Sequence, residues 1–166
     1  VILLPDFFEI NRFREDFLMN TLLVKQLRAL IQDESNLIAN LSNVSALLNA
    51  HFDQINWVGF YLWDDQDQEL VLGPFQGKVA CNRIPMGRGV CGSALQQQQT
   101  LIIPDVHAFA GHIACDSASR SEIVVPIIID GQPFGVLDID APVTDRFTTE
   151  DQALLEACID ELKKVI

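Results

Sequence analysis

Residues 121–140 read SEIVVPIIIDGQPFGVLDID, two apolar and β-branched runs with an Asp-Gly pair between them. Asp130-Gly131 is a strong hairpin signal, because two-residue turns between antiparallel strands need positive φ angles that Asp and Gly adopt easily. We therefore expect paired strands at Glu122–Ile129 and Gln132–Ile139. This stretch predicts an antiparallel sheet.

The register of this hairpin decides where its acidic residues point. A two-residue turn sets Glu122 opposite Ile139. Asp138 and Asp140 then lie one residue to either side of that position. On a flat ladder the glutamate and the aspartates face opposite sides, unless a bulge or a twist intervenes.

The rest of the chain adds helices and a second hairpin. Apolar residues recur at helical spacing in several segments, and aromatic and β-branched residues fill two segments joined by a polar turn. The expected elements are a helix at Thr21–Ile31, a helix capped by Ser35, strands at Ile55–Trp63 and Glu69–Phe75, a short helix at Gly92–Gln99, a strand at Leu101–Ile103 and a last helix capped by Thr149 with Gln152. This order predicts one α+β domain, a central antiparallel sheet flanked by helices.

Two long segments carry little sign of regular structure. Gly73–Gly92 is marked by glycines, and Pro104–Ser121 contains His107 and His112. Loops of this length inside a compact domain are usually functional or mobile. Neither histidine belongs to an H-x-x-x-H or C-x-x-C pattern, so we expect no metal site.

Length and charge narrow the class of protein. A chain of 166 residues suits one domain. Its formal net charge of −12 repels nucleic-acid phosphates and anionic membranes, so we expect neither partner. No apolar run approaches the roughly 20 residues that span a bilayer, and no basic segment precedes the apolar N-terminal residues as in a signal peptide. Four cysteines without an export signal favour a reducing compartment, the cytoplasm.

The first residues stand apart from these patterns. The chain starts with valine, whereas Met19-Asn20-Thr21 would make an ordinary start. We treat residues 1–18 as an N-terminal extension and residues 19–166 as the catalytic domain. Upstream read-through, a cloning remnant and a native extension are all open as origins of the extension.

The cysteines are the best clue to chemistry. Cys81, Cys91 and Cys115 lie in loop-rich sequence, whereas Cys158 lies on the apolar face of the last helix and is expected to be packing. No pair has the C-x-x-C spacing of zinc or thioredoxin-like sites. Cys115 precedes Asp116 in a polar loop, a poor setting for a core residue. Two such loop thiols, brought together, alternate between dithiol and disulfide.

Two aspartates add an acidic feature. Asp138 and Asp140 are two apart on a strand, so they share one side of the sheet, and Leu137 and Ile139 supply the other side to the core. Such a pair either borders solvent or forms a pocket for an ammonium group or a protonated carboxyl. The pattern alone leaves both alternatives open.

Several motifs resemble those of the free methionine-(R)-sulfoxide reductases, which are built on a GAF domain. The resemblance runs from about Leu37 to the C-terminus, and it is specific, because ordinary GAF sensors carry neither the three placed cysteines nor this acid set. The motifs are NWVGFY (residues 56–61), LGPFQG (72–77), AC (80–81), GRGVCG (87–92), DVH (105–107), GHIACD (111–116), SEI (121–123) and GVLDID (135–140).

The resemblance implies a reaction and roles for the cysteines. It implies reduction of the R epimer of free methionine sulfoxide by a homodimer, with electrons from thioredoxin and with neither metal nor organic cofactor. Cys115 would attack the sulfoxide sulfur, Cys81 would be the resolving thiol, and Cys91 a second candidate for recycling. We expect backbone amides of Gly87–Gly92 to bind the substrate carboxylate.

The resemblance also implies the walls of the pocket. Trp57 and Tyr61 would surround the substrate methyl group, and Glu122, Asp138 and Asp140 would hold the sulfoxide oxygen and the ammonium group. Sulfoxide oxygen leaves only when protonated, and crowded carboxyls in an apolar pocket supply an acid with a raised pKa. We therefore expect a bulge or twist to bring Glu122 to the aspartates. The competing hypothesis is a non-catalytic GAF sensor of a small molecule or of redox state.

Overall fold

The computed structural model describes residues 7–113 and 115–166. Its centre is a six-stranded antiparallel sheet with the strand order β3-β2-β1-β6-β5-β4. The elements are α1 (Phe7–Ile31), α2 (Leu37–His51), β1 (Trp57–Asp64), β2 (Glu69–Gly77), β3 (Arg83–Pro85), α3 (Gly89–Gln97), β4 (Leu101–Ile103), the 3-10 helix η1 (Val106–Ala108), β5 (Ser121–Ile129), β6 (Gln132–Ala141) and α4 (Thr149–Leu162). The predicted α+β architecture is confirmed.

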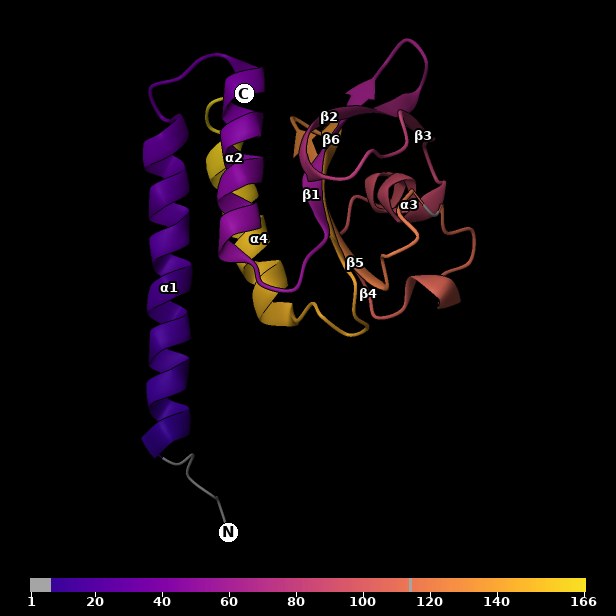
Figure 1. The fold of residues 1–166 in the computed structure, drawn as a ribbon. Coiled ribbons are helices and arrows are strands. Elements are labelled where there is room, and N and C mark those ends of the chain that lie inside the picture. Colours follow the sequence, from indigo (N-terminus) through magenta and orange to yellow (C-terminus); the bar gives the residue numbers. More distant parts are fainter. Residues whose placement is uncertain (1–6, 114) are drawn as a thin grey trace.

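The sheet lies between two unequal helical layers (Figure 1). On one face α2 and α4 cover the sheet and α1 packs on them (Figure 1); Leu27, Leu41 and Leu155 of these helices share the main core with apolar residues of β5 and β6. On the other face α3 packs over Tyr61 and Val136 in a smaller core. The apolar and acidic sides of β6 therefore serve different layers, and the acidic side faces α3.

The N-terminal helices differ from the prediction in length and capping. The predicted helix at Thr21–Ile31 is the second half of a longer helix, and Figure 1 shows its first half running past the ends of α2 and α4. Residues 1–6 lie outside the described residues, and the boundary drawn after residue 18 stays a prediction. Asn36, not Ser35, caps α2.

The segment Gly73–Gly92 is more regular than predicted. Strand β2 continues to Gly77, a short strand forms at Arg83–Pro85, and α3 already begins at Gly89. No strand was predicted at Arg83–Pro85, because three residues are too few for an alternating pattern. Among the described residues no helix combines the length and apolar character needed to cross a membrane.

The cap of helix α4 lies one residue earlier than predicted. Thr148 and Asp151 form a capping box, so the predicted pair of Thr149 and Gln152 is wrong by one residue. Thr148 has the extended backbone that a cap requires, whereas Thr149 is already helical. Cys158 is buried in the main core, as predicted.

The central hairpin forms at Asp130-Gly131, as predicted, with positive φ at both positions. Its register changes between Ile127 and Ile128 of β5, where one extra residue of β6, Phe134, bulges out. Glu122 consequently pairs with Asp140, and the prediction that it lies opposite Ile139 is wrong. The expected bulge is present, and it turns the glutamate to the side of the aspartates.

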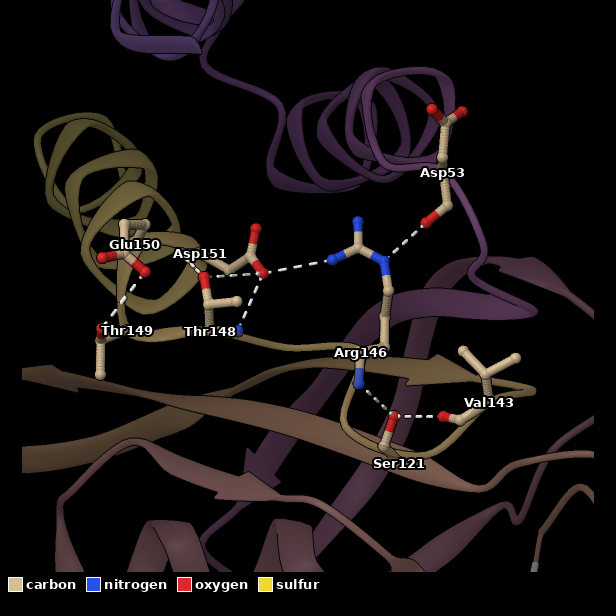
Figure 2. A network of polar contacts seen from close by, with 8 residues as sticks. All are labelled: Asp53, Ser121, Val143, Arg146, Thr148, Thr149, Glu150 and Asp151. Atoms are coloured by element: carbon tan, nitrogen blue, oxygen red, sulfur yellow. Dashed lines mark hydrogen bonds and ion pairs between the residues drawn. The ribbon is translucent and has the colours of Figure 1, made fainter. Parts of the chain in front are cut away.

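A polar network fastens the start of β5 to the helical layer (Figure 2). The Ser121 hydroxyl donates to the carbonyl of Val143 at 2.6 Å and accepts from the amide of Arg146 at 3.3 Å. The Arg146 guanidinium donates to the carbonyl of Asp53 at 2.8 Å and lies 3.2 Å from the Asp151 carboxylate. The first residues of β5 are thereby held at a fixed place relative to α2 and α4.

Candidate functional site

Seven of the eight predicted site residues line one cavity between the sheet and α3. They are Trp57, Tyr61, Cys91, Cys115, Glu122, Asp138 and Asp140. The eighth, Cys81, joins the site through a disulfide bond to Cys115, with the two Cα atoms 5.4 Å apart. The cavity has a volume of about 30 Å³, which is room for one or two water molecules.

The three carboxyl groups gather on the α3 side of β5 and β6. Glu122 and Asp140 are paired across the ladder, and Asp138 follows on the same side of β6. Strand β6 lies inside the sheet, between β1 and β5, so the alternative in which the aspartates border solvent at an edge is wrong. Glu122 and Asp138 are only 5% and 6% exposed, which makes this a buried acidic cluster.

Burial makes these carboxyls unusually weak acids. Loss of hydration raises the pKa of Glu122 well above its ordinary value, and the charges of Asp138 and Asp140 raise it further. Burial likewise raises the pKa of Asp138 to about 7 and that of Asp140 well above its usual range. Each ionised carboxyl of this cluster raises the pKa of Glu122, so keeping a proton on the cluster is favoured. The cluster can therefore hold a proton near neutral pH and donate it.

One oxygen of the cluster is left for a ligand. Asp138 Oδ1 is buried and has no hydrogen-bond partner among the described residues. A buried acceptor without a donor is costly, so a cationic or hydroxyl donor entering the cavity would be favoured there. An ammonium group meets this requirement.

Cys91 belongs to the acid cluster rather than to the disulfide. Its thiol is buried, and its Sγ lies 3.9 Å from Glu122 Oε1 as a hydrogen-bond donor. Burial and the charges of Asp138 and Glu122 raise its pKa well above the ordinary value, so the thiol stays protonated. Its predicted role in recycling stays a prediction.

The same cluster is the candidate for a metal. One ligand atom each from Cys91, Glu122 and Asp138 lies within 4.8 Å of the others. A cation there would have to displace the thiol proton and the carboxyl proton, both of which burial retains. These donors suit proton chemistry better than metal binding.

The segment predicted to bind a carboxylate is the first turn of α3. Gly89, Val90 and Cys91 line the cavity, and no side chain caps this helix at Arg88. First-turn amides of a helix have no intrahelical partner and attract anions. Binding of a carboxylate by these backbone amides stays a prediction. The amides belong to the start of a helix and not to a loop.

Sequence reasoning missed two residues that support the site. Asn56 Nδ2 donates to Asp116 Oδ2 and to Ser119 Oγ, both at 3.1 Å, and so fastens the loop that carries Cys115 to the start of β1. Ser119 also hydrogen-bonds Asp140. Asn56 and Asp116 belong to the quoted motifs, but their pairing across 60 positions has no local signal.

His112 is the second of these residues. It lines the cavity, and its Nδ1 lies 4.0 Å from Glu122 Oε2. Burial lowers its pKa, so the imidazole is neutral. From the sequence, His112 was considered only as a metal ligand. Its position in the same motif as Cys115, residues 111–116, could have indicated that it lies at the site.

Comparisons with known proteins show which proteins the chain is similar to. The GAF domain family matches residues 29–166. The free methionine-R-sulfoxide reductase of Escherichia coli (strain K12) is 53% identical over 142 residues, which cover 86% of this chain and 85% of that protein. The structure of fRMsr of Staphylococcus aureus in complex with substrate is 57% identical, with a TM-score of 0.83 and coverage of 88% of this chain and 94% of that one. The free methionine-R-sulfoxide reductase from Neisseria meningitidis, in complex with its substrate, is 45% identical, with a TM-score of 0.86 and coverage of 88% and 87%.

Proposed function

Because the chain belongs to the free methionine-R-sulfoxide reductases of the GAF domain family, we propose that it reduces the R epimer of free methionine sulfoxide to methionine. The observation that carries the proposal is a buried acid cluster and a disulfide-bonded cysteine, Cys115, that line one cavity. A sulfoxide needs a nucleophile at sulfur and a proton at oxygen, and Cys115 and the acid cluster could supply them.

The first step uses Cys115 and the acid cluster. In the reduced enzyme the Cys115 thiolate attacks the sulfoxide sulfur while Glu122 gives its proton to the oxygen. The oxygen passes to the cysteine, methionine leaves, and Cys115 becomes a sulfenic acid. The raised pKa of Glu122 supports its role as the acid, because an ordinary glutamate would have no proton to give at neutral pH.

The second step uses Cys81. Its thiolate attacks the Cys115 sulfur, the S–O bond breaks, and the departing hydroxide takes a proton to form water. The product is the Cys81–Cys115 disulfide present in the structure. Thioredoxin then returns both sulfurs to thiols in the proposed cycle.

The remaining walls select a free amino acid. The rings of Trp57 and Tyr61, stacked with centroids 5.8 Å apart, would surround the substrate methyl group. Asp138 and Asp140 would accept the ammonium group, and the first-turn amides of α3 would bind the carboxylate. The cavity of the disulfide form is too small for an amino acid, so substrate would enter only after the disulfide is reduced.

We also propose that the enzyme is a cytoplasmic homodimer. Its unpaired Cys91 and Cys158 suit a reducing compartment. Large apolar side chains of the helical layer are exposed, which suits contact with a second copy. They are Leu18, Met19, Leu22, Leu30 and Ile38.

One assay tests the proposed activity. Purified enzyme is mixed with free methionine (R)-sulfoxide, thioredoxin, thioredoxin reductase and NADPH, and methionine is quantified by chromatography. The S epimer serves as the matched control and should not react. Saturable binding of the R epimer without formation of methionine would favour the sensor function instead.

A further inference from the structure

The segment between β2 and β3, residues 78–82, carries Cys81 and has no regular secondary structure. Val79 within it is 88% exposed, whereas Ala80 and Cys81 are half-buried and pack against the smaller core. Its main chain reaches the sheet ladder through one bond at its end, from the amide of Leu72 to the carbonyl of Asn82 at 2.9 Å. Contacts from side chains must therefore help to set the position of Cys81.

Two aromatic side chains of β1 supply that support. Trp57 Nε1 donates to the carbonyl of Lys78 at 3.1 Å, and the Tyr61 hydroxyl donates to the carbonyl of Cys81 at 3.1 Å. Both rings are buried, and Trp57 also stacks on Phe75 of β2 with centroids 5.2 Å apart. The two donors are therefore held in the packed interior, whereas the segment that they contact has no regular secondary structure.

The entry to the segment is shaped to receive one of these rings. Gly77 has a φ of 139°, and a Cβ there would meet Trp57 Cδ1 at 2.5 Å. The indole thus lies directly against the chain where it leaves β2. The two hydrogen bonds and this close contact together define the path to Cys81.

We propose that Tyr61 is a positioning residue for the resolving cysteine, with its hydroxyl holding the main chain of Cys81 where the thiol can reach Cys115. This role rests on the proposed function and adds to it a task that the ring, as a pocket wall, does not perform. The phenol remains a donor, because burial and the neighbouring carboxylates raise its pKa. The same side chain then surrounds the substrate with its ring and places the second thiol with its hydroxyl.

The role concerns one chemical step. The Cys81 thiol loses its proton, its sulfur bonds to the Cys115 sulfur, and the sulfenic oxygen departs as water, so that one sulfur is oxidised and the other reduced. Holding Cys81 near its position in the product raises the rate of this step and favours the disulfide over the dithiol. The preceding attack on substrate uses the Cys115 sulfur and does not use the Cys81 thiol.

The test uses Tyr61→Phe, which keeps the ring and removes only the hydroxyl. The first measurement needs no sulfoxide. Full-length protein is equilibrated with mixtures of reduced and oxidised glutathione, and the Cys81–Cys115 disulfide is quantified by alkylation and mass spectrometry. Loss of one hydrogen bond should lower the dithiol–disulfide equilibrium constant about fivefold. An unchanged constant would overturn the proposal.

The second measurement follows a single turnover with methionine (R)-sulfoxide. In Tyr61→Phe the dimedone-trapped sulfenate at Cys115 should persist longer, with disulfide formation slowed at least several-fold more than methionine release. Equal slowing of both steps would mean that Tyr61 acts only as a pocket wall and would contradict the role. If no methionine forms in the wild type, the proposed function fails, and the glutathione equilibrium still decides the role of Tyr61.

Two further variants guard against a general packing effect. Trp57→Phe removes the bond to Lys78 and should shift the glutathione equilibrium in the same direction. Ser45→Ala removes a buried hydroxyl that bonds main-chain carbonyls elsewhere, at Leu41 and Pro74, and should leave the equilibrium unchanged. A shift of the same size in Ser45→Ala would contradict the local role.

Discussion

Glu122 lies directly opposite Asp140 across the β5–β6 ladder, and this pairing depends on the one-residue bulge at Phe134 near the turn. Without the extra residue Glu122 would face the main core, and its carboxyl would be buried among leucine and isoleucine side chains. With it, three carboxyls meet on the side of α3. A feature beside the hairpin turn thus assembles a site at the far end of the strands.

Replacing Glu122 by Gln should slow the reduction of methionine sulfoxide by a factor of roughly 10²–10⁴, the usual contribution of a general acid. The amide keeps the shape of the side chain but has no acidic proton, so substrate binding should change much less. Stopped-flow measurement of sulfenate formation at Cys115 checks this. Glu150→Gln, at an exposed position in the first turn of α4, is the matched control. Sulfenate formation at the wild-type rate in Glu122→Gln would assign the acid to Asp138 or Asp140.

Much of this arrangement was predictable, and the exceptions have a common cause. Local signals identified both hairpins and the turn at Asp130-Gly131, because turn chemistry and alternation act over a few residues. The predicted pairing of Glu122 with Ile139 is wrong because no local sequence signal marks Phe134 as a bulge. The hydrogen bonds of Asn56 to the Cys115 loop, and of Tyr61 to Cys81, join distant segments and leave no periodic trace.

The cysteines should separate by role when each is replaced by serine. Cys115→Ser should abolish reduction, because Cys91, the other thiol that lines the cavity, stays protonated and cannot attack the sulfoxide. Cys81→Ser should form about one methionine per subunit and then stop, since the sulfenic acid has no resolving thiol. Cys158→Ser is the control, because its thiol is buried in the main core. Methionine counts under single-turnover and thioredoxin-coupled conditions check all three, and repeated turnover by Cys115→Ser would exclude it as the nucleophile.

The substrate should need a free ammonium group. Asp138 Oδ1 is buried without a partner among the described residues, and an acetylated nitrogen would carry no charge to satisfy it. We expect kcat/KM for N-acetylmethionine (R)-sulfoxide and for peptide-bound methionine sulfoxide to fall at least a hundredfold, about 3 kcal/mol, the cost of leaving a buried charged group unsatisfied. Coupled assays with the three substrates at equal concentration check this. Comparable kcat/KM for the peptide would point to a protein-repair enzyme.

The acid cluster should make the folded protein less stable as the pH rises. Burial raises the pKa of Asp138 to about 7, so the folded state keeps a proton that the unfolded chain loses above pH of about 4. Because the folded state then binds more protons than the unfolded chain, the free energy of unfolding decreases as the pH rises from about 4 to about 7. Glu122 and Asp140 face the same group and act in the same sense, the Cys91 thiol stays protonated, and the half-buried His112 acts in the opposite sense because its pKa is lowered.

Comparison with Asp138→Asn isolates the contribution of Asp138. The amide cannot ionise, so the variant should gain stability relative to the wild type as the pH rises from 4.5 to 8, by as much as roughly 4 kcal/mol for a shift of about three pKa units. Urea denaturation at several pH values gives both curves. Asp65→Asn, in the exposed turn after β1, should run parallel to the wild type. If Asp138→Asn also runs parallel, Asp138 is ionised throughout this range and cannot hold the proton of the cluster.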